Sequence, residues 1–131
     1  MNIGKLAENT GVTAKTIRYY EEIGLIPRAR RTDAGYRNYG HNDAHMLRFI
    51  RRARNLGFTV DECRELVALY QDKNRSSADV KRLAEERVAE IDRKISELGG
   101  MRDALRELAE KCRGDHRPDC PIIDDLSQKD R

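Results

Sequence analysis

The chain has 131 residues, of which 37% are charged and 38% hydrophobic, with no tryptophan and a net charge of +3. This length allows one modest domain or a small domain with an appended long helix, and it excludes two full hydrophobic cores. The chain opens without the basic and then apolar pattern of a signal peptide, and it has no run of about 18 apolar residues that could span a membrane. We therefore expect a cytoplasmic protein without a membrane span, whose cysteines are reduced thiols.

Two short helices joined by a glycine turn are expected at the start of the chain. Residues 2–9 follow a helical apolar pattern, Gly11 turns the chain, and Thr13 caps a second helix that runs to about Glu22. This arrangement is typical of a helix-turn-helix. Residues 1–54 carry 11 Lys and Arg against 5 Asp and Glu, which suggests a polyanion-binding face, with an ordinary solvated face as the alternative.

A small β-hairpin, interpreted as a wing, is expected next. Pro27 prevents a helix from continuing, and a turn at Asp33 to Gly35 precedes alternating aromatic residues. On the second helix, Ile17 and Tyr19 are expected to turn inward. Exposed polar, basic and phenolic side chains can reach base edges and phosphates. The candidates for DNA contact are Thr13, Lys15, Arg18 and Tyr20 on the helix and Tyr36 and Arg37 on the wing.

A second helical pair follows the hairpin. Its first helix is expected to start at Asp43 and to end at Gly57, and its second helix starts at a capping box formed by Thr59 and Glu62. Cys63 lies on the apolar face of this second helix. We interpret Cys63 as a small core residue.

One long helix is expected from residue 76 to residue 111. At 1.5 Å per residue it is roughly 50 Å long, more than so small a body can cover, so we expect it to pair with the same helix of a second copy. Folding back on its own domain is the alternative. Gly99 and Gly100 mark either a soft point or a close helix approach. Its apolar seam has heptad spacing and comprises Ala84, Val88, Ile91, Ile95, Leu98, Leu105 and Ala109.

Cys112 and Cys120 flank a short loop that contains glycine and proline. A structural zinc site needs four ligands, whereas this loop holds two thiols and at most His116 or an aspartate, and we expect His116 to be exposed rather than a ligand. Two thiolates suit a soft ion of low coordination number, of which Cu(I) is the commonest in cells. A redox switch and incidental thiols are the alternatives.

The stretch from Ile17 to Ile26, followed by Gly35 to Tyr39, resembles the signature of the MerR family of transcription regulators, and the resemblance continues through Arg54 to Phe58. It implies a mainly α fold: a winged helix-turn-helix DNA-binding domain with a small β-hairpin wing, a second helical pair, and a long antiparallel coiled-coil dimerisation helix. The expected divisions are 1–71 for the DNA-binding domain with the second helical pair, 76–111 for the dimerisation helix, and 112–131 for the metal-binding loop, short terminal helix and tail.

The resemblance also implies a mechanism. In this family a homodimer sits on promoter DNA with an over-long spacer and, with its effector bound, bends and undertwists that spacer so that RNA polymerase engages both promoter elements. Such deformation costs roughly several kcal/mol. The terminal loop is similar to that of copper-efflux regulators, which implies that Cys112 and Cys120 bind one Cu(I), Ag(I) or Au(I) linearly.

The same resemblance implies that two residues of the long helix act on that site. Members that respond to divalent ions place a third cysteine where this chain has Ser77, so Ser77 favours a monovalent ion. Two thiolates around a monocation leave a net negative charge that needs a positive neighbour. Lys81 and the amide end of the helix starting near Pro121 are the candidates.

No catalytic constellation is visible in the sequence, so the chain is not expected to be an enzyme. The predicted function is activation of copper-efflux promoters in response to Cu(I). A thiol redox sensor on the same scaffold is one alternative, and a copper-buffering or chaperone protein is another.

Overall fold

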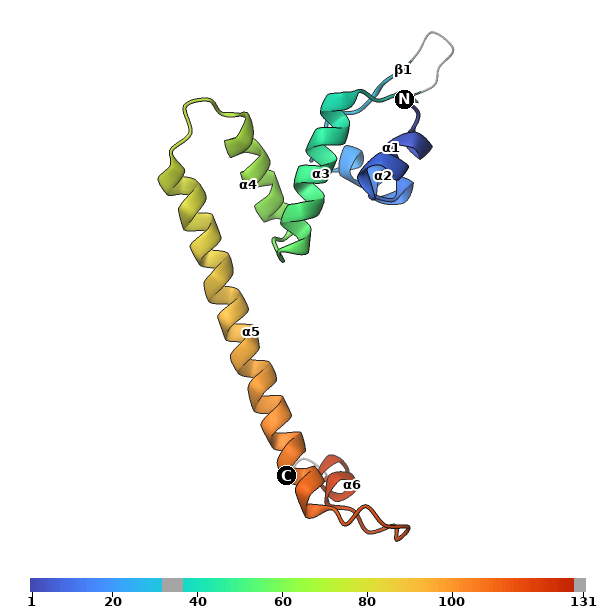
Figure 1. Ribbon diagram of the computed structural model, residues 1–131, viewed down its shortest axis with the longest axis vertical. Helices are drawn as coiled ribbons and strands as arrows, with labels where there is room; N and C mark the ends of the chain where they lie inside the picture. Colours follow the sequence, from blue (N-terminus) through green and yellow to red (C-terminus); the bar gives the residue numbers. More distant parts are fainter. Residues whose placement is uncertain (32–36, 129–131) are drawn as a thin grey trace. The chain divides into compact units, whose positions relative to one another are not determined.

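The computed structural model describes residues 1–31 and 37–128 of a mainly helical protein. These residues divide into two compact units, Met1–Arg87 and Val88–Arg131. No helix in the described ranges combines the length and the apolar character that crossing a bilayer requires. In chain order the elements are α1 (Ile3–Thr10), α2 (Ala14–Glu22), β1 (Arg30–Arg31), β2 (Arg37–Asn38), α3 (His41–Asn55), α4 (Val60–Gln71), α5 (Ser77–Lys111) and α6 (Pro121–Leu126) (Figure 1).

The first two helices and the turn between them match the sequence prediction. Gly11 ends α1 in the left-handed conformation, with φ of 73°, and its N–H donates to the carbonyl of Ala7 at 2.9 Å. A side chain with a Cβ atom adopts this conformation only at a cost, which is why glycine stands there. Thr13 then caps α2, because its hydroxyl oxygen accepts a hydrogen bond from the Thr16 N–H at 3.2 Å.

Two short strands lie where the hairpin is expected. β1 and β2 pair in antiparallel fashion, with Arg30 opposite Asn38 and Arg31 opposite Arg37. The predicted turn at Asp33 to Gly35 lies outside the described residues. The strand pair is therefore observed, whereas the wing as a whole stays a prediction.

The second helical pair is present, with one corrected boundary. The predicted start of the first of these helices at Asp43 is wrong, because α3 begins at His41. Asp43 caps the helix from its third position, where its carboxylate accepts a hydrogen bond from the Gly40 N–H at 2.9 Å. The predicted capping box of α4 is confirmed: the Thr59 hydroxyl accepts from the Glu62 N–H at 3.1 Å, and the Glu62 carboxylate accepts from the Thr59 N–H at 2.8 Å.

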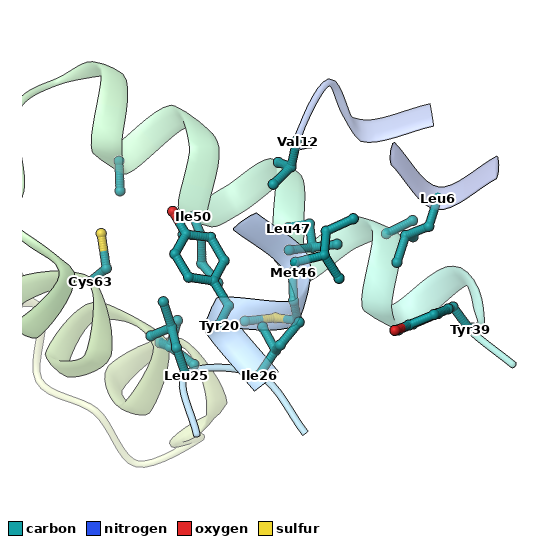
Figure 2. Packing of buried hydrophobic residues seen from close by; sticks show 14 of the residues in the cluster. Leu6, Val12, Tyr20, Leu25, Ile26, Tyr39, Met46, Leu47, Ile50 and Cys63 are labelled. Carbon is teal, nitrogen blue, oxygen red and sulfur yellow. The ribbon is translucent and has the colours of Figure 1, made fainter. Parts of the chain in front are cut away.

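One hydrophobic core holds the N-terminal unit together, and it is built from one face of each of α1 to α4 (Figure 2). Each large aliphatic side chain buried in such a core stabilises the fold by roughly 1.5–3 kcal/mol. Cys63 is fully buried, which confirms its predicted core position, and burial raises the pKa of its thiol. The largest fully buried side chains are Leu6, Ile17, Tyr39, Leu47, Ile50 and Cys63.

The long helix α5 runs unbroken through Gly99 and Gly100, as predicted. Its beginning belongs to the N-terminal unit, where Leu83 and Arg87 are buried and the Arg87 guanidinium lies against Gly57. From Val88 onward most of its apolar side chains are exposed in the single chain, and Leu108 is half-buried. The exposed large side chains of the predicted seam are Val88, Ile91, Ile95, Leu98 and Leu105, and the small Ala84 and Ala109 are exposed as well.

Candidate metal centre and nucleic-acid interface

The structure brings the two predicted sulfur ligands together. Cys112 directly follows the last residue of α5, and Cys120 is the residue that precedes α6. Gly114, between them, adopts the left-handed conformation with φ of 65°, which favours glycine. Both cysteines are free and half-buried, and their Sγ atoms are 3.2 Å apart. One short loop therefore presents two sulfur atoms in direct contact.

The environment of Cys120 favours its thiolate. The pKa of the Cys120 thiol is lowered by a hydrogen bond from the backbone amide of Ile123, then by one from the Cys112 thiol, and then by one from the backbone amide of Ile122. Both amides belong to the first turn of α6, whose N–H groups have no partner within the helix. Negative charge on Cys120 is thus stabilised by the end of the helix that follows it.

Two ion pairs lie in and beside the loop. The Asp115 carboxylate accepts a hydrogen bond from the Arg117 backbone N–H at 2.9 Å and lies 3.8 Å from the Arg117 guanidinium. Lys111 forms an ion pair with Glu107 at 3.1 Å. His116 is exposed, as the sequence predicts.

Ser77 and Lys81 lie at the other end of α5 from the cysteine pair. Ser77 is the first residue of the helix, and Lys81 follows one turn later. Both side chains are exposed, and the Lys81 ammonium lies 3.8 Å from the Glu85 carboxylate. They belong to the N-terminal unit, whereas the cysteines belong to the other unit, so a role at the metal stays a prediction.

The second candidate site is the solvent-facing side of α2. Thr13, Lys15 and Arg18 are exposed there, as predicted. The Thr13 hydroxyl is already engaged, because it accepts from the Thr16 N–H and donates to the Thr16 hydroxyl at 2.9 Å. Lys15 and Arg18 are therefore the exposed cationic side chains of this face.

The predicted orientation of the two tyrosines of α2 is wrong. Tyr20 packs in the core (Figure 2). Its side chain is 7% exposed, whereas that of Tyr19 is 48% exposed. The buried residues of α2 are Ile17, Tyr20 and Glu21, three and four positions apart, and Tyr19 falls on the opposite face. Burial raises the pKa of the Tyr20 phenol, an effect that the nearby Arg54 partly offsets. Tyr19 is therefore the tyrosine that α2 presents to solvent.

The two candidates on the wing are not tested by the structure. Tyr36 lies outside the described residues. The backbone of Arg37 forms part of β2, but its side chain lies outside the described part of the structure. Both contacts stay predictions.

Two features of this unit escaped the sequence reasoning. Glu21 is buried, and its carboxylate accepts hydrogen bonds from the Tyr39 hydroxyl at 2.6 Å and from the Ala29 N–H at 3.0 Å. No spacing rule links residues so far apart in the chain.

The second feature is a group of arginines on α3 at positions 48, 51 and 52, whose helical spacing is visible in the sequence.

Comparison with known protein families finds matches over most of the chain. Residues 1–69 match the MerR HTH family regulatory protein model, and residues 44–108 match the model described as MerR, DNA binding. The helix-turn-helix region and all of α5 except its last three residues thus fall within the matched residues.

Individual relatives and a solved structure agree over nearly the whole length. The chain is 54% identical to the heavy metal-dependent transcription regulator 2 of Rhizobium meliloti, covering 97% of this chain and 86% of the relative. It is 53% identical to the HTH-type transcriptional regulator CueR of Salmonella typhimurium, covering 97% and 92%. Its structure is similar to that of the transcription regulator PbrR691 from Ralstonia metallidurans in complex with lead(II), with a TM-score of 0.83, 30% identity and coverage of 97% and 99%.

Proposed function

Because this chain belongs to the MerR family of helix-turn-helix regulatory proteins, we propose that it is a dimeric transcription activator that responds to Cu(I) through Cys112 and Cys120. Ag(I) and Au(I) are the alternative ligands. The homologues are transcription regulators, a family without enzymatic activity. The observation that carries the proposal is the 3.2 Å contact between two free cysteine sulfurs on one short loop.

The donor set fits a soft monovalent ion. At metal–sulfur bonds of about 2.3 Å, linear coordination of one ion would place the two sulfurs roughly 4.6 Å apart, so the sulfurs, which are 3.2 Å apart here, would move apart to bind the ion in that way. Thiolates select soft ions such as Cu(I), and the lowered pKa of Cys120 supplies the deprotonated form that binds. A bound ion would cross-link the end of α5 to the start of α6.

Charge balance at this site points to a second copy of the chain. The amides of Ile122 and Ile123 already stabilise negative charge on Cys120. We propose that Lys81 adds a positive charge and that Ser77 keeps a third thiolate out of the site. Antiparallel pairing of two α5 helices would bring the first residues of one helix to the last residues of the other, and the exposed seam of α5 supports such pairing.

The same proposal assigns one role to each of three parts of the chain. Residues 1–71 would bind promoter DNA, 76–111 would pair the two copies, and 112–131 would hold the ion. On the DNA side, we propose contacts from Thr13, Lys15 and Arg18 of α2, with Tyr19 taking the place of the buried Tyr20. The wing would add Tyr36 and Arg37.

Activation, as we propose it, is a change of DNA shape. Both copies hold the promoter before and after the ion binds, and the bound form bends and undertwists the spacer so that RNA polymerase engages both promoter elements. The energy of such a deformation is roughly several kcal/mol and is offset by phosphate contacts on both half-sites.

A footprint on the region upstream of this gene, with and without Cu(I) under anaerobic conditions, tests the proposal. We expect protection in both states and altered cleavage at the spacer only with Cu(I). Cys112→Ser should keep the footprint and lose the response, whereas the matched variant Cys63→Ala, in the core, should keep both. A Cys112→Ser variant that still activates transcription on copper addition would contradict the assignment.

The contact between the two sulfurs also favours a thiol redox sensor as a second candidate function. Two thiols this close can form a disulfide when a peroxide takes up their two electrons and two protons and is reduced. A response to peroxide without copper, reversed by dithiothreitol, would support this candidate. A copper-buffering protein is the third candidate, and duplex binding that weakens steeply with salt would contradict it.

A further inference from the structure

An open groove of about 470 Å³ lies between the end of α1 and the outer face of α3. Three exposed arginines of α3 line it, Arg48, Arg51 and Arg52. Positions three and four apart share one face of a helix, so the three side chains emerge on the same side.

Arg51 builds the wall of this groove. Its guanidinium donates a hydrogen bond to the Thr10 carbonyl at 3.3 Å and lies over Gly11, where a Cβ atom would overlap it. The arginine therefore joins α3 to the turn between α1 and α2. Arg48 and Arg52 flank it with their charged ends in solvent.

The charge of the groove selects an anion. The only acidic side chain among its described lining residues is Glu8, which pairs with Lys5 at 3.8 Å, so the three guanidiniums dominate. A guanidinium presents a planar fork of N–H donors that matches two phosphate oxygens. The groove therefore suits a phosphate group better than an apolar ligand.

The position of the groove indicates that this phosphate would belong to the DNA backbone. The Gly11 turn leads directly into Thr13 and the first turn of α2, whose residues we propose to read bases. In a helix-turn-helix the N-terminal part of the second helix enters the major groove while the first helix crosses the DNA backbone. A DNA strand that passes the start of α2 therefore passes the end of α1, where the groove lies.

We propose that Arg48, Arg51 and Arg52 form a seat for one backbone phosphate of the operator, beyond the contacts made by α2 and the wing. This inference rests on the proposed DNA-binding function. Contacts to phosphates carry no sequence information, so the seat would add affinity for every duplex and would set the angle at which α2 enters the groove.

Salt-dependent binding of the full-length protein to its operator and to an unrelated duplex tests the seat. Because a dimer places one seat on each half-site, we expect Arg48→Gln and Arg52→Gln each to reduce the magnitude of the slope of log affinity against log salt by up to about 2, with losses of affinity on both duplexes. Lysine at both positions should restore the slope, because it keeps the charge. The matched control is Arg102→Gln, an exposed arginine of α5 paired with its neighbour Asp103.

The outcomes separate the two proposals. Wild-type protein that binds no duplex would contradict the proposed function itself. Wild-type binding with unchanged slope and affinity in both glutamine variants would overturn the seat and leave the proposed function intact. Unchanged duplex binding with reduced transcription by RNA polymerase would also overturn it, since the arginines would then contact an acidic protein surface. Circular dichroism of the variants should match that of the wild type, because both side chains are exposed.

Discussion

The hydroxyl of Tyr39 donates a 2.6 Å hydrogen bond to Oε1 of Glu21, and both side chains are buried. Oε2 of the same carboxylate accepts a hydrogen bond from the Ala29 N–H at 3.0 Å. Ala29 precedes β1 and Tyr39 follows β2, so one carboxylate on α2 holds both ends of the strand pair. The position of the strands relative to α2 therefore depends on this buried group.

Replacing Glu21 by glutamine should destabilise the N-terminal unit by about 1–3 kcal/mol, because the amide nitrogen cannot accept a hydrogen bond from either donor and the bond that remains is no longer charge-assisted. Tyr39→Phe removes only the hydroxyl and should cost about 1–2 kcal/mol. Urea unfolding at fixed protein concentration measures both changes. The double variant should lose less than the sum, whereas strict additivity would show that the two groups are not coupled.

Alanine at Gly11 should destabilise the protein by about 1–2 kcal/mol. A Cβ at this position is strained by the positive φ, and it displaces the Arg51 guanidinium from the Thr10 carbonyl. Gly4→Ala is the matched control, because Gly4 lies within α1 where its Cβ meets only the Asn2 side chain at ordinary distance, and it should be neutral or stabilising. Equal melting temperatures for the two variants would contradict this account.

Local rules predicted the elements well, and the reason is that caps and turns act over a few residues. Thr13, Gly11 and the Thr59–Glu62 box signal helix ends through their own hydrogen bonds, and the structure has all of them. The start of α3 was wrongly predicted at Asp43, because a carboxylate can cap a helix from its third position as well as from the residue before it.

Contacts between residues far apart in the chain could not be predicted from the sequence, because such local rules act over only a few residues. The orientation of Tyr19 and Tyr20 follows from which face of α2 meets the core, and two adjacent tyrosines look alike in the sequence. The sulfur contact was expected from the loop, but the amides that lower the pKa of Cys120 depend on how α6 begins. The partners of Glu21 lie 8 and 18 residues away, with no periodicity that could predict them.

The thiols should differ in their reactivity with pH. The lowered pKa of Cys120 keeps it deprotonated below the pH at which an ordinary thiol protonates, so its alkylation by iodoacetamide should slow only when the pH falls through that lower value. The raised pKa and burial of Cys63 should keep it unreactive until the protein unfolds. Cys112→Ala should move the midpoint for Cys120 upward but leave it below the ordinary value, because the amides of α6 remain. Peptide mapping after brief alkylation measures each thiol, and a Cys120 rate that falls at the same pH as that of an ordinary thiol would contradict this.

A lysine in the exposed seam of α5 should separate the two copies. Ile95 is 61% exposed in the single chain, so Ile95→Lys leaves the fold of one copy intact. In a paired helix the same ammonium would be buried without a partner, at a cost of about 3 kcal/mol or more per copy, which weakens dimerisation by more than about a hundredfold. Ser96→Lys introduces the same side chain one position outside the seam and should remain dimeric. Sedimentation equilibrium distinguishes the two, and a dimeric Ile95→Lys variant would show that the copies do not meet along this stripe.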